Sequence, residues 1–167
     1  MADFKKAANL TIVNEDGYVN DPRDAGGETN FGISKRSYPN LDIKSLTLDE
    51  ALAIYLRDFW DPLYASIKDQ LVANSVFDLG VLFGRHAVVK VLQTILGKLL
   101  VDGVFGPLTL AAVNAQEPVT FLLHFKNAMV AYAVVIVNRN PNDSVFLTGW
   151  SNRIKIITQI VPVVSCP

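Results

Sequence analysis

Residues 15–33 interrupt a chain whose hydrophobic pattern is otherwise helical, and they constrain the fold more than any other stretch. This segment has no helical period, and its turn, β-branched and aromatic residues predict a small twisted β-hairpin. It contains five of the sixteen acidic residues and four of the ten glycines. A surface loop has little reason to bracket so many carboxylates with aromatic residues and paired glycines. We therefore interpret residues 15–33 as a candidate active site held by a helical scaffold.

A first helix is expected over residues 3–14, where apolar residues recur at helical intervals. Glu15 would then lie at its C-terminal end, and Gly17 would stop the helix. The negative end of the helix dipole and burial both disfavour an ionised carboxylate, so both would raise the pKa of Glu15. A raised pKa suits a general acid that works near neutrality. By residue type alone, an exposed acid at a frayed helix end is the simpler alternative.

The hairpin is expected to fold back over the end of this helix, with a short strand at residues 29–33. This arrangement brings Asp24 and Thr29 towards Glu15. A pair of carboxylates, one protonated and one ionised, performs the chemistry in most glycosidases, and a hydroxyl is a natural partner for the attacking water. The spacing by itself is weak evidence, because many loops contain both kinds of acid.

The remaining chain predicts helices separated by glycine and proline. Thr47 and Glu50 form a capping box that opens the first of them. The expected helices cover residues 48–59, 69–83, 85–96, 107–114, 118–138 and a last segment after the turn at 140–143. The expected fold is therefore mainly α-helical, with one small β-hairpin next to Glu15.

Composition excludes several classes of function. A formal net charge of −1 provides no electrostatic footprint for nucleic acid or an anionic membrane. One cysteine excludes an intrachain disulfide, and two separated histidines without a Cys-x-x-Cys pair argue against a zinc site, so no metal or cofactor is expected. His86 and His124 are each flanked by apolar helix residues and are interpreted as structural.

No membrane span or signal peptide is expected. The most apolar segment, residues 127–138, has twelve residues, which is too short to cross a bilayer and suits a buried helix. The charged N-terminal residues are not followed by an apolar run. The protein is expected to be made in the cytoplasm, so that any action outside requires another route of release.

Aromatic residues near the hairpin offer stacking faces for sugar rings, although aromatic residues beside amphipathic helices more often belong to the core. The candidates are Tyr18, Phe31, Tyr38, Trp60 and Tyr64. Glu28 has a claim as a second acid, but a residue between a glycine pair and a strand is often simply exposed.

Residues 15–33 resemble the signature of glycoside hydrolase family 108, whose members are predicted or demonstrated N-acetylmuramidases of phages and bacteria. The similarity continues through residues 59–60, 76–78, 84 and 92–93. Residues 102–109 and 149–153 are similar to the predicted peptidoglycan-binding region that accompanies the family. The Asp-Gly-x-x-Gly-Pro loop also has a sufficient structural explanation as a turn followed by a helix start.

The resemblance implies a lysozyme-like fold with Glu15 as the catalytic acid and Asp24 and Thr29 as water-positioning residues. We expect substrate contacts at Tyr18, Glu28, Asn30, Phe31 and Trp60. Two positions depart from the family pattern. Asp16 replaces a glycine after the catalytic acid, and Leu82 stands where a polar asparagine is expected.

These features together predict two regions packed on one continuous core. Residues 1–90 form the muramidase region with the hairpin, and residues 91–167 form the helical peptidoglycan-binding region. The expected activity is that of a monomeric, bacteriolytic endolysin that cleaves the β-1,4 bond between N-acetylmuramic acid and N-acetylglucosamine, with a holin as one route of release. The alternatives are a lytic transglycosylase and a non-catalytic wall-binding, assembly or secretion accessory protein.

Overall fold

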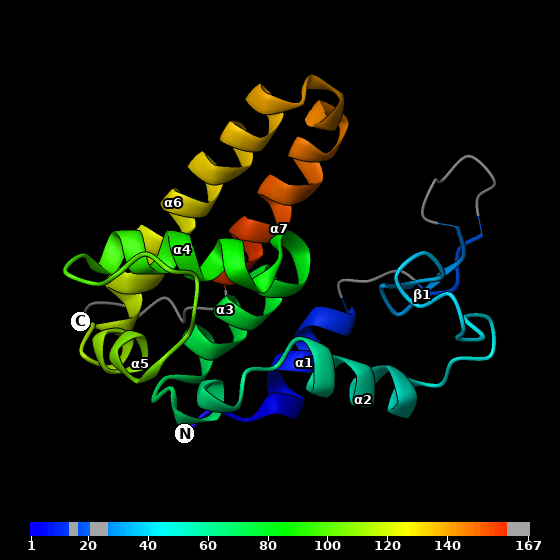
Figure 1. The fold of residues 1–167 in the computed structure, drawn as a ribbon, viewed down its shortest axis with the longest axis horizontal. Helices are drawn as coiled ribbons and strands as arrows, with labels where there is room; N and C mark the ends of the chain where they lie inside the picture. The colour runs from blue at the N-terminus through cyan, green and yellow to red at the C-terminus, as the bar shows by residue number, and fades with distance from the viewer. Residues whose placement is uncertain (14–16, 21–26, 160–167) are drawn as a thin grey trace, which may run out of the picture. The chain divides into compact units, whose positions relative to one another are not determined.

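The protein is mainly helical with one small antiparallel sheet, which confirms the expected fold class (Figure 1). The structure is a computed structural model that describes residues 1–13, 17–20 and 27–159. The chain divides into two compact units, and each is described by itself. Unit 1 comprises Met1–Asp3 and Asp61–Pro167, and unit 2 comprises Phe4–Trp60.

The described elements follow the predicted order. Unit 2 contains α1 (Phe4–Val13), β1 (Thr29–Asn30), β2 (Ile33–Ser34) and α2 (Leu48–Asp58). Unit 1 contains η1 (Pro62–Ser66), α3 (Gln70–Phe83), α4 (Arg85–Leu96), α5 (Pro107–Asn114), α6 (Pro118–Arg139), η2 (Pro141–Phe146) and α7 (Leu147–Gln159). The predicted boundary at residue 90 falls inside α4. The predicted division into a muramidase region and a peptidoglycan-binding region at this boundary stays a prediction.

Helix α2 begins where the sequence predicts. The Thr47 hydroxyl accepts a hydrogen bond from the Glu50 backbone N–H, and the Glu50 carboxylate accepts one from the Thr47 N–H. This reciprocal pair satisfies two of the N–H groups that a helix start leaves without intrahelical partners. The capping box therefore fixes the direction in which α2 leaves the preceding loop.

The hairpin is tighter than expected, and the prediction of a single strand over residues 29–33 is wrong. The chain turns back at Phe31 and Gly32, so that Thr29 pairs with Ser34 and Asn30 pairs with Ile33. Both turn residues have positive φ, 49° at Phe31 and 74° at Gly32. A two-residue turn with this backbone matches the right-handed twist of its strands, but a phenylalanine at the first position hides it from sequence inspection.

Unit 1 is built on α3, whose residues from Val72 to Gly80 are all buried. Helix α4 packs beside α3, and α6 packs against both of them. Helices α6 and α7 run side by side, joined by η2 (Figure 1). Helix α3 is therefore the central element of unit 1, which explains why its sequence is hydrophobic on nearly every side.

Helix α6 is longer than its most apolar part. It has 22 residues, and among the described residues it is the one helix whose length and hydropathy are sufficient to cross a membrane. Only 28% of its most apolar window is buried. Core helices of soluble proteins pass the same test of length and composition, so this finding is weak evidence for a span.

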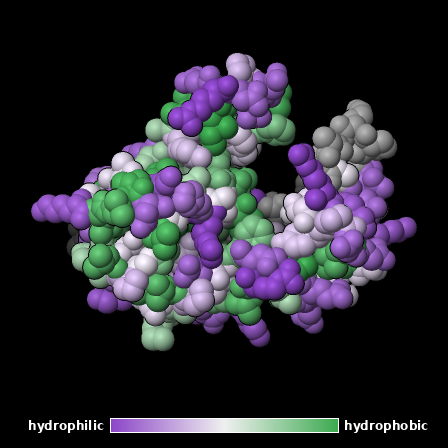
Figure 2. Space-filling model, in the orientation of Figure 1, coloured by the Kyte–Doolittle hydropathy of each residue, from purple (hydrophilic) through white to green (hydrophobic). Residues whose placement is uncertain are grey.

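Several aliphatic side chains of unit 1 are exposed near α5. Figure 2 shows hydrophobic surface over this part of the molecule. The exposed residues there are Leu100, Val101, Val104 and Leu108, of which Leu100 and Leu108 are more than three-quarters exposed.

A buried ion pair fixes α7 on α3. The Arg153 Nε donates to Asp78 Oδ2 at 3.0 Å, and Nη2 donates to Oδ1 at 2.9 Å. The two side chains are only 13% and 9% exposed. Around this pair, Trp150 of α7 meets the ring of Phe83 edge-on, with centroids 5.4 Å apart. The Gly-Trp-x-Asn-Arg segment therefore has a structural role in joining the last helix to the central one.

We expect Arg153→Ala to lower the free energy of unfolding by about 3 kcal/mol, because it leaves the Asp78 carboxylate buried without its charged partner. The measurement is urea denaturation. Arg139→Ala, at the exposed end of α6, is the matched control and should change the stability by less than about 0.5 kcal/mol. Equal effects of the two substitutions would contradict the assignment.

Candidate active site

Two of the three predicted catalytic residues, Glu15 and Asp24, lie outside the described residues, as does Asp16. Helix α1 ends at Val13, two positions before Glu15 in the sequence. Thr29 lies within the described residues, in strand β1.

Thr29 lies in the middle of a three-segment backbone arrangement. Its N–H donates to the Val19 carbonyl at 2.9 Å, and its carbonyl accepts from the Val19 N–H at 2.8 Å. On its other side Thr29 pairs with Ser34 in β2. Since both edges of β1 are paired here, the backbone of Thr29 is held in place, and its side chain is half-buried.

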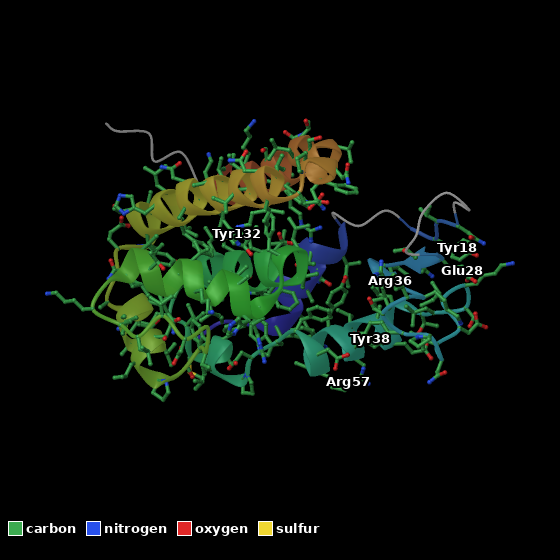
Figure 3. The ribbon with its side chains drawn as sticks, turned by 45° about the horizontal axis from the view of Figure 1, so that its top comes forward. Tyr18, Glu28, Arg36, Tyr38, Arg57 and Tyr132 are labelled. Carbon is green, nitrogen blue, oxygen red and sulfur yellow. The ribbon has the colours of Figure 1, made fainter. Side chains whose placement is uncertain are left out.

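Tyr18 and Glu28 come together beside Thr29. The Tyr18 hydroxyl donates to Glu28 Oε2 at 3.4 Å, and both side chains lie at the outer end of the hairpin (Figure 3). The contact is long and exposed, so it adds little to stability. It places a phenol and a carboxylate next to the predicted water-positioning residue.

Asn30 faces the interior of unit 2. It is buried, and its amide Nδ2 donates to the carbonyls of Ile43 and Leu46 at 3.1 and 3.4 Å. The turn beyond it is held by Tyr55, whose hydroxyl donates to the Phe31 carbonyl at 2.9 Å. These contacts favour a structural role for Asn30, because they anchor the hairpin to the loop before α2 and to α2 itself.

Trp60 also lies in the interior of unit 2. Its side chain is buried and meets Phe4 edge-on, with ring centroids 5.4 Å apart. This placement favours a role in packing α1, and the structure does not bring Trp60 together with Thr29. Its predicted substrate contact stays a prediction, as do those of Tyr18, Glu28, Asn30 and Phe31.

A polar cluster that the sequence does not reveal lies after the hairpin. The Tyr38 hydroxyl donates to Asp58 Oδ2 at 2.7 Å, and Arg57 donates to both oxygens of the same carboxylate at 2.6 Å. Burial, followed by the hydrogen bond to Asp58, raises the pKa of Tyr38 to about 12. The hydrogen bond from Arg57 lowers the pKa of Asp58. At neutral pH the phenol therefore stays protonated and the carboxylate ionised.

This cluster borders an open cavity of about 490 Å³ between α2 and the loop after β2. The lining residues are Ser37, Tyr38, Pro39, Asn40, Leu41, Glu50, Ile54 and Arg57. Of these lining residues, the sequence indicates only Tyr38 as a binding candidate. The available signal was the spacing of Glu50, Ile54 and Arg57, which places them on one face of a helix.

Metal chemistry has no ready site in the described ranges. No group of three or more histidine, cysteine, aspartate or glutamate residues there is placed to hold a metal ion.

The Asp-Gly loop of unit 1 is organised by Gln93, which is buried in α4. Its amide Nε2 donates to Asp102 Oδ1 at 2.8 Å, and its Oε1 accepts from the Gly103 N–H at 2.9 Å. Gly103 has φ 77°, and a Cβ there would lie 2.4 Å from the ring of His86. The loop therefore requires glycine for both backbone conformation and space.

The residues after this loop also have structural roles. Phe105 is buried and meets Tyr64 edge-on at 4.8 Å between centroids, and Pro107 is the first residue of α5. The buried Thr109 hydroxyl lies 3.2 Å from the Gln93 amide. These motif residues thus have structural explanations, and the loop by itself does not identify a ligand site.

The mainly helical architecture and the hairpin that carries Thr29 fit a lysozyme-like fold. Comparison with known proteins shows which families the two regions of the chain match. Residues 8–84 match the model of glycosyl hydrolase 108, and residues 87–155 match the predicted peptidoglycan domain. The protein therefore combines a region similar to glycosyl hydrolase 108 with a region similar to the predicted peptidoglycan domain, and it is a peptidoglycan hydrolase.

A solved structure supports the same fold. The structure of Brucella abortus SagA is similar over 93% of this chain and 91% of that chain, with a TM-score of 0.77 and 28% sequence identity. No curated protein sequence matches the chain.

We expect Asn30→Ala to reduce the free energy of unfolding by about 2 kcal/mol, because two backbone carbonyls lose their donor. Thermal unfolding followed by circular dichroism measures the change, and Asn142→Ala, at an exposed position in η2, is the control. If Asn30 contacts substrate and does not hold the hairpin, activity falls while the melting temperature stays unchanged.

Gln93→Ala should destabilise the protein by about 2–3 kcal/mol, because the Gly103 N–H and the Asp102 carboxylate both lose a partner. Urea denaturation tests this expectation against Gln116→Ala, whose exposed side chain makes one bond to the Ala112 carbonyl. Similar losses from both substitutions would show that Gln93 does not organise the loop.

Proposed function

We propose that this peptidoglycan hydrolase is an N-acetylmuramidase that cleaves the β-1,4 bond between N-acetylmuramic acid and N-acetylglucosamine. The observation that carries the proposal is the family match over residues 8–84, which includes Glu15, Asp24 and Thr29. The matched segment also contains the described hairpin frame around Thr29.

In this proposal Glu15 is the general acid that protonates the leaving oxygen of the glycosidic bond. Its position in the sequence, just after the C-terminal turn of α1, supports the assignment. The negative end of a helix dipole disfavours the ionised form of a nearby carboxyl group, which is the direction that a general acid requires.

Asp24 and Thr29 orient the attacking water on the other side of the bond. The doubly paired backbone of Thr29 supports this role, because a water-positioning hydroxyl must itself be held in place. An ionised Asp24 would accept a proton from the water, and the Thr29 oxygen would accept a hydrogen bond or donate one to it.

We propose further that the protein acts as a monomer on the cell wall or in the periplasm after release from the cytoplasm, in the manner of a phage endolysin. A holin would provide one route of release. A bacteriolytic effect on cells is expected only after the protein has left the cytoplasm and reached the cell wall.

Glu15→Gln should lower the rate of clearing of purified cell walls by at least about 100-fold, because it removes the transferable proton but keeps the side-chain shape. The decrease in turbidity of the wall suspension measures this rate. Thr29→Ser, which keeps the hydroxyl, should retain much more activity than Thr29→Ala. A Glu15→Gln variant as active as the parent would overturn the mechanism.

Mass spectrometry of the digested wall separates the alternatives. Hydrolysis gives products heavier by one water than the anhydro-sugar products of a lytic transglycosylase. Full activity in Asp24→Ala together with anhydro ends would establish the single-acid reaction. Binding to walls without release of any fragment would establish a non-catalytic protein.

A further inference from the structure

The cavity of about 490 Å³ between α2 and residues 37–41 has a charged group at each end of its helical wall. Glu50, Ile54 and Arg57 project from α2 at positions i, i+4 and i+7, which share one helix face. At 1.5 Å of rise per residue, Glu50 and Arg57 stand about 10 Å apart along the helix axis. Between them Ile54 supplies an apolar, 7% exposed surface.

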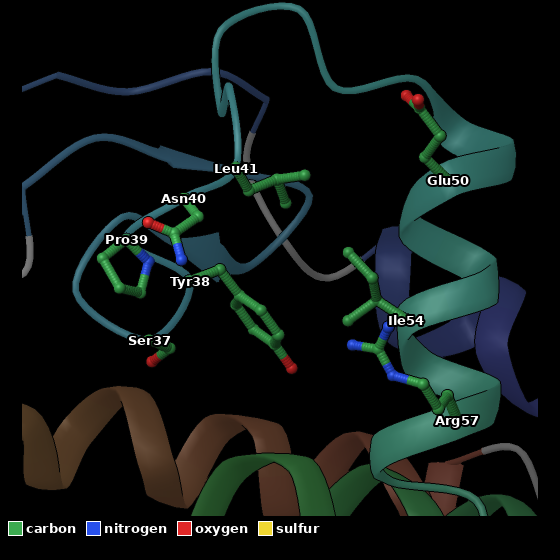
Figure 4. A pocket seen from close by; sticks show the side chains of 8 residues that line it. All are labelled: Ser37, Tyr38, Pro39, Asn40, Leu41, Glu50, Ile54 and Arg57. Carbon is green, nitrogen blue, oxygen red and sulfur yellow. The ribbon is translucent and has the colours of Figure 1, made fainter.

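The opposite wall is held in place by the hairpin. Figure 4 shows Tyr38 and Leu41 directed from the loop towards α2. The Tyr38 N–H donates to the Ser34 carbonyl in β2 at 3.0 Å, and Lys35 Nζ donates to the Leu41 carbonyl at 2.7 Å. The strand pair that carries Thr29 therefore continues directly into the wall of the cavity, which is largely pre-formed for a ligand.

Both charged groups keep capacity for a ligand. Thr47 donates its N–H and its hydroxyl to Oε2 of Glu50, and these bonds hold the pKa of Glu50 below its ordinary value. A carboxylate accepts about four hydrogen bonds, so Glu50 can still receive an ammonium group. Arg57 uses Nε and Nη2 on Asp58 and has five N–H donors in all.

We propose that this cavity binds the peptide substituent of peptidoglycan, with a ligand amino group at Glu50 and a ligand carboxylate or carbonyl at Arg57. An extended peptide advances about 3.3–3.6 Å per residue, so about three residues bridge the two charges. The aliphatic surface of Ile54, Leu41 and Pro39 fits small side chains such as alanine methyl groups.

A neutral sugar fits this arrangement less well than a peptide does. Sugar rings present hydroxyl groups without charge, whereas two opposite charges about 10 Å apart complement a ligand that carries both an amino group and a carboxylate. The inference deepens the proposed function, because it assigns the recognition of the peptide to a cavity beside the hairpin and leaves the glycan to the catalytic residues.

The test compares Glu50→Gln with Asp49→Asn in the full chain. Glutamine keeps the capping box and removes the charge from the cavity. Asp49 is the preceding residue of α2, carries the same charge and does not line the cavity, so Asp49→Asn is the matched control. The probes are the free tetrapeptide Ala–iso-Glu–Lys–Ala and a peptide-free N-acetylglucosamine tetramer, titrated by NMR or calorimetry.

We expect Glu50→Gln to weaken tetrapeptide binding by about two- to five-fold, as for a partly exposed ion pair, and to leave binding of the sugar tetramer unchanged. Asp49→Asn should bind both probes as the parent does. Arg57→Gln should also weaken tetrapeptide binding. Absence of tetrapeptide binding in the parent, or equal binding by the Glu50→Gln and Asp49→Asn variants, would overturn the proposal.

A decrease in binding of the sugar tetramer alone would identify the cavity as a glycan subsite, which also overturns the proposal. The outcome is independent of catalysis, because neither probe has to be cleaved. Glu15→Gln should bind the tetrapeptide like the parent. An unaltered activity of Glu15→Gln with a clear effect of Glu50→Gln would refute the muramidase mechanism and keep the peptide site.

Discussion

The ion pair between Asp78 and Arg153 holds the last helix of unit 1, α7, on its central helix, α3. Both charged groups are nearly removed from water, so each is costly without the other. Their pairing requires one register of α7 on α3, since the guanidinium must meet both oxygens of a single carboxylate. Asp78 lies in the segment matched to the hydrolase family and Arg153 in the peptidoglycan domain. The pair therefore joins the two matched regions within one compact unit.

In unit 2 the hairpin is held by hydrogen bonds from buried or partly buried side chains. Asn30 binds two carbonyls of the loop before α2, and Tyr55 of α2 binds the turn at Phe31. These bonds connect the short strand of Thr29 to α2. The connection is needed because an isolated two-stranded hairpin is only marginally stable in water. The residues that support the candidate site are thus different from those that are expected to carry its chemistry.

The predictable part of the fold consists of features written in local sequence. The capping box at Thr47, the break at Gly84 and the helix start at Pro107 all lie where the pattern indicates. The turn at Phe31 and Gly32 was missed, because its first position has no residue that favours positive φ. The polar cluster of Tyr38, Asp58 and Arg57 was missed because Tyr38 is 20 residues from Asp58 in the sequence and meets the Arg57–Asp58 pair only after folding.

The sequence by itself determined the helical class, the order of the elements and the family, because periodicity, caps and motifs are local properties of the chain. It also indicated Glu15, Asp24 and Thr29 through their motif. Only the tertiary structure decided that Asn30 and Trp60 face the interior of unit 2, and that Gln93 organises the loop at Gly103. It alone revealed the cavity beside α2. The physical reason is that burial and long-range pairing depend on which surfaces meet, and this information does not lie in the spacing of residues along the chain.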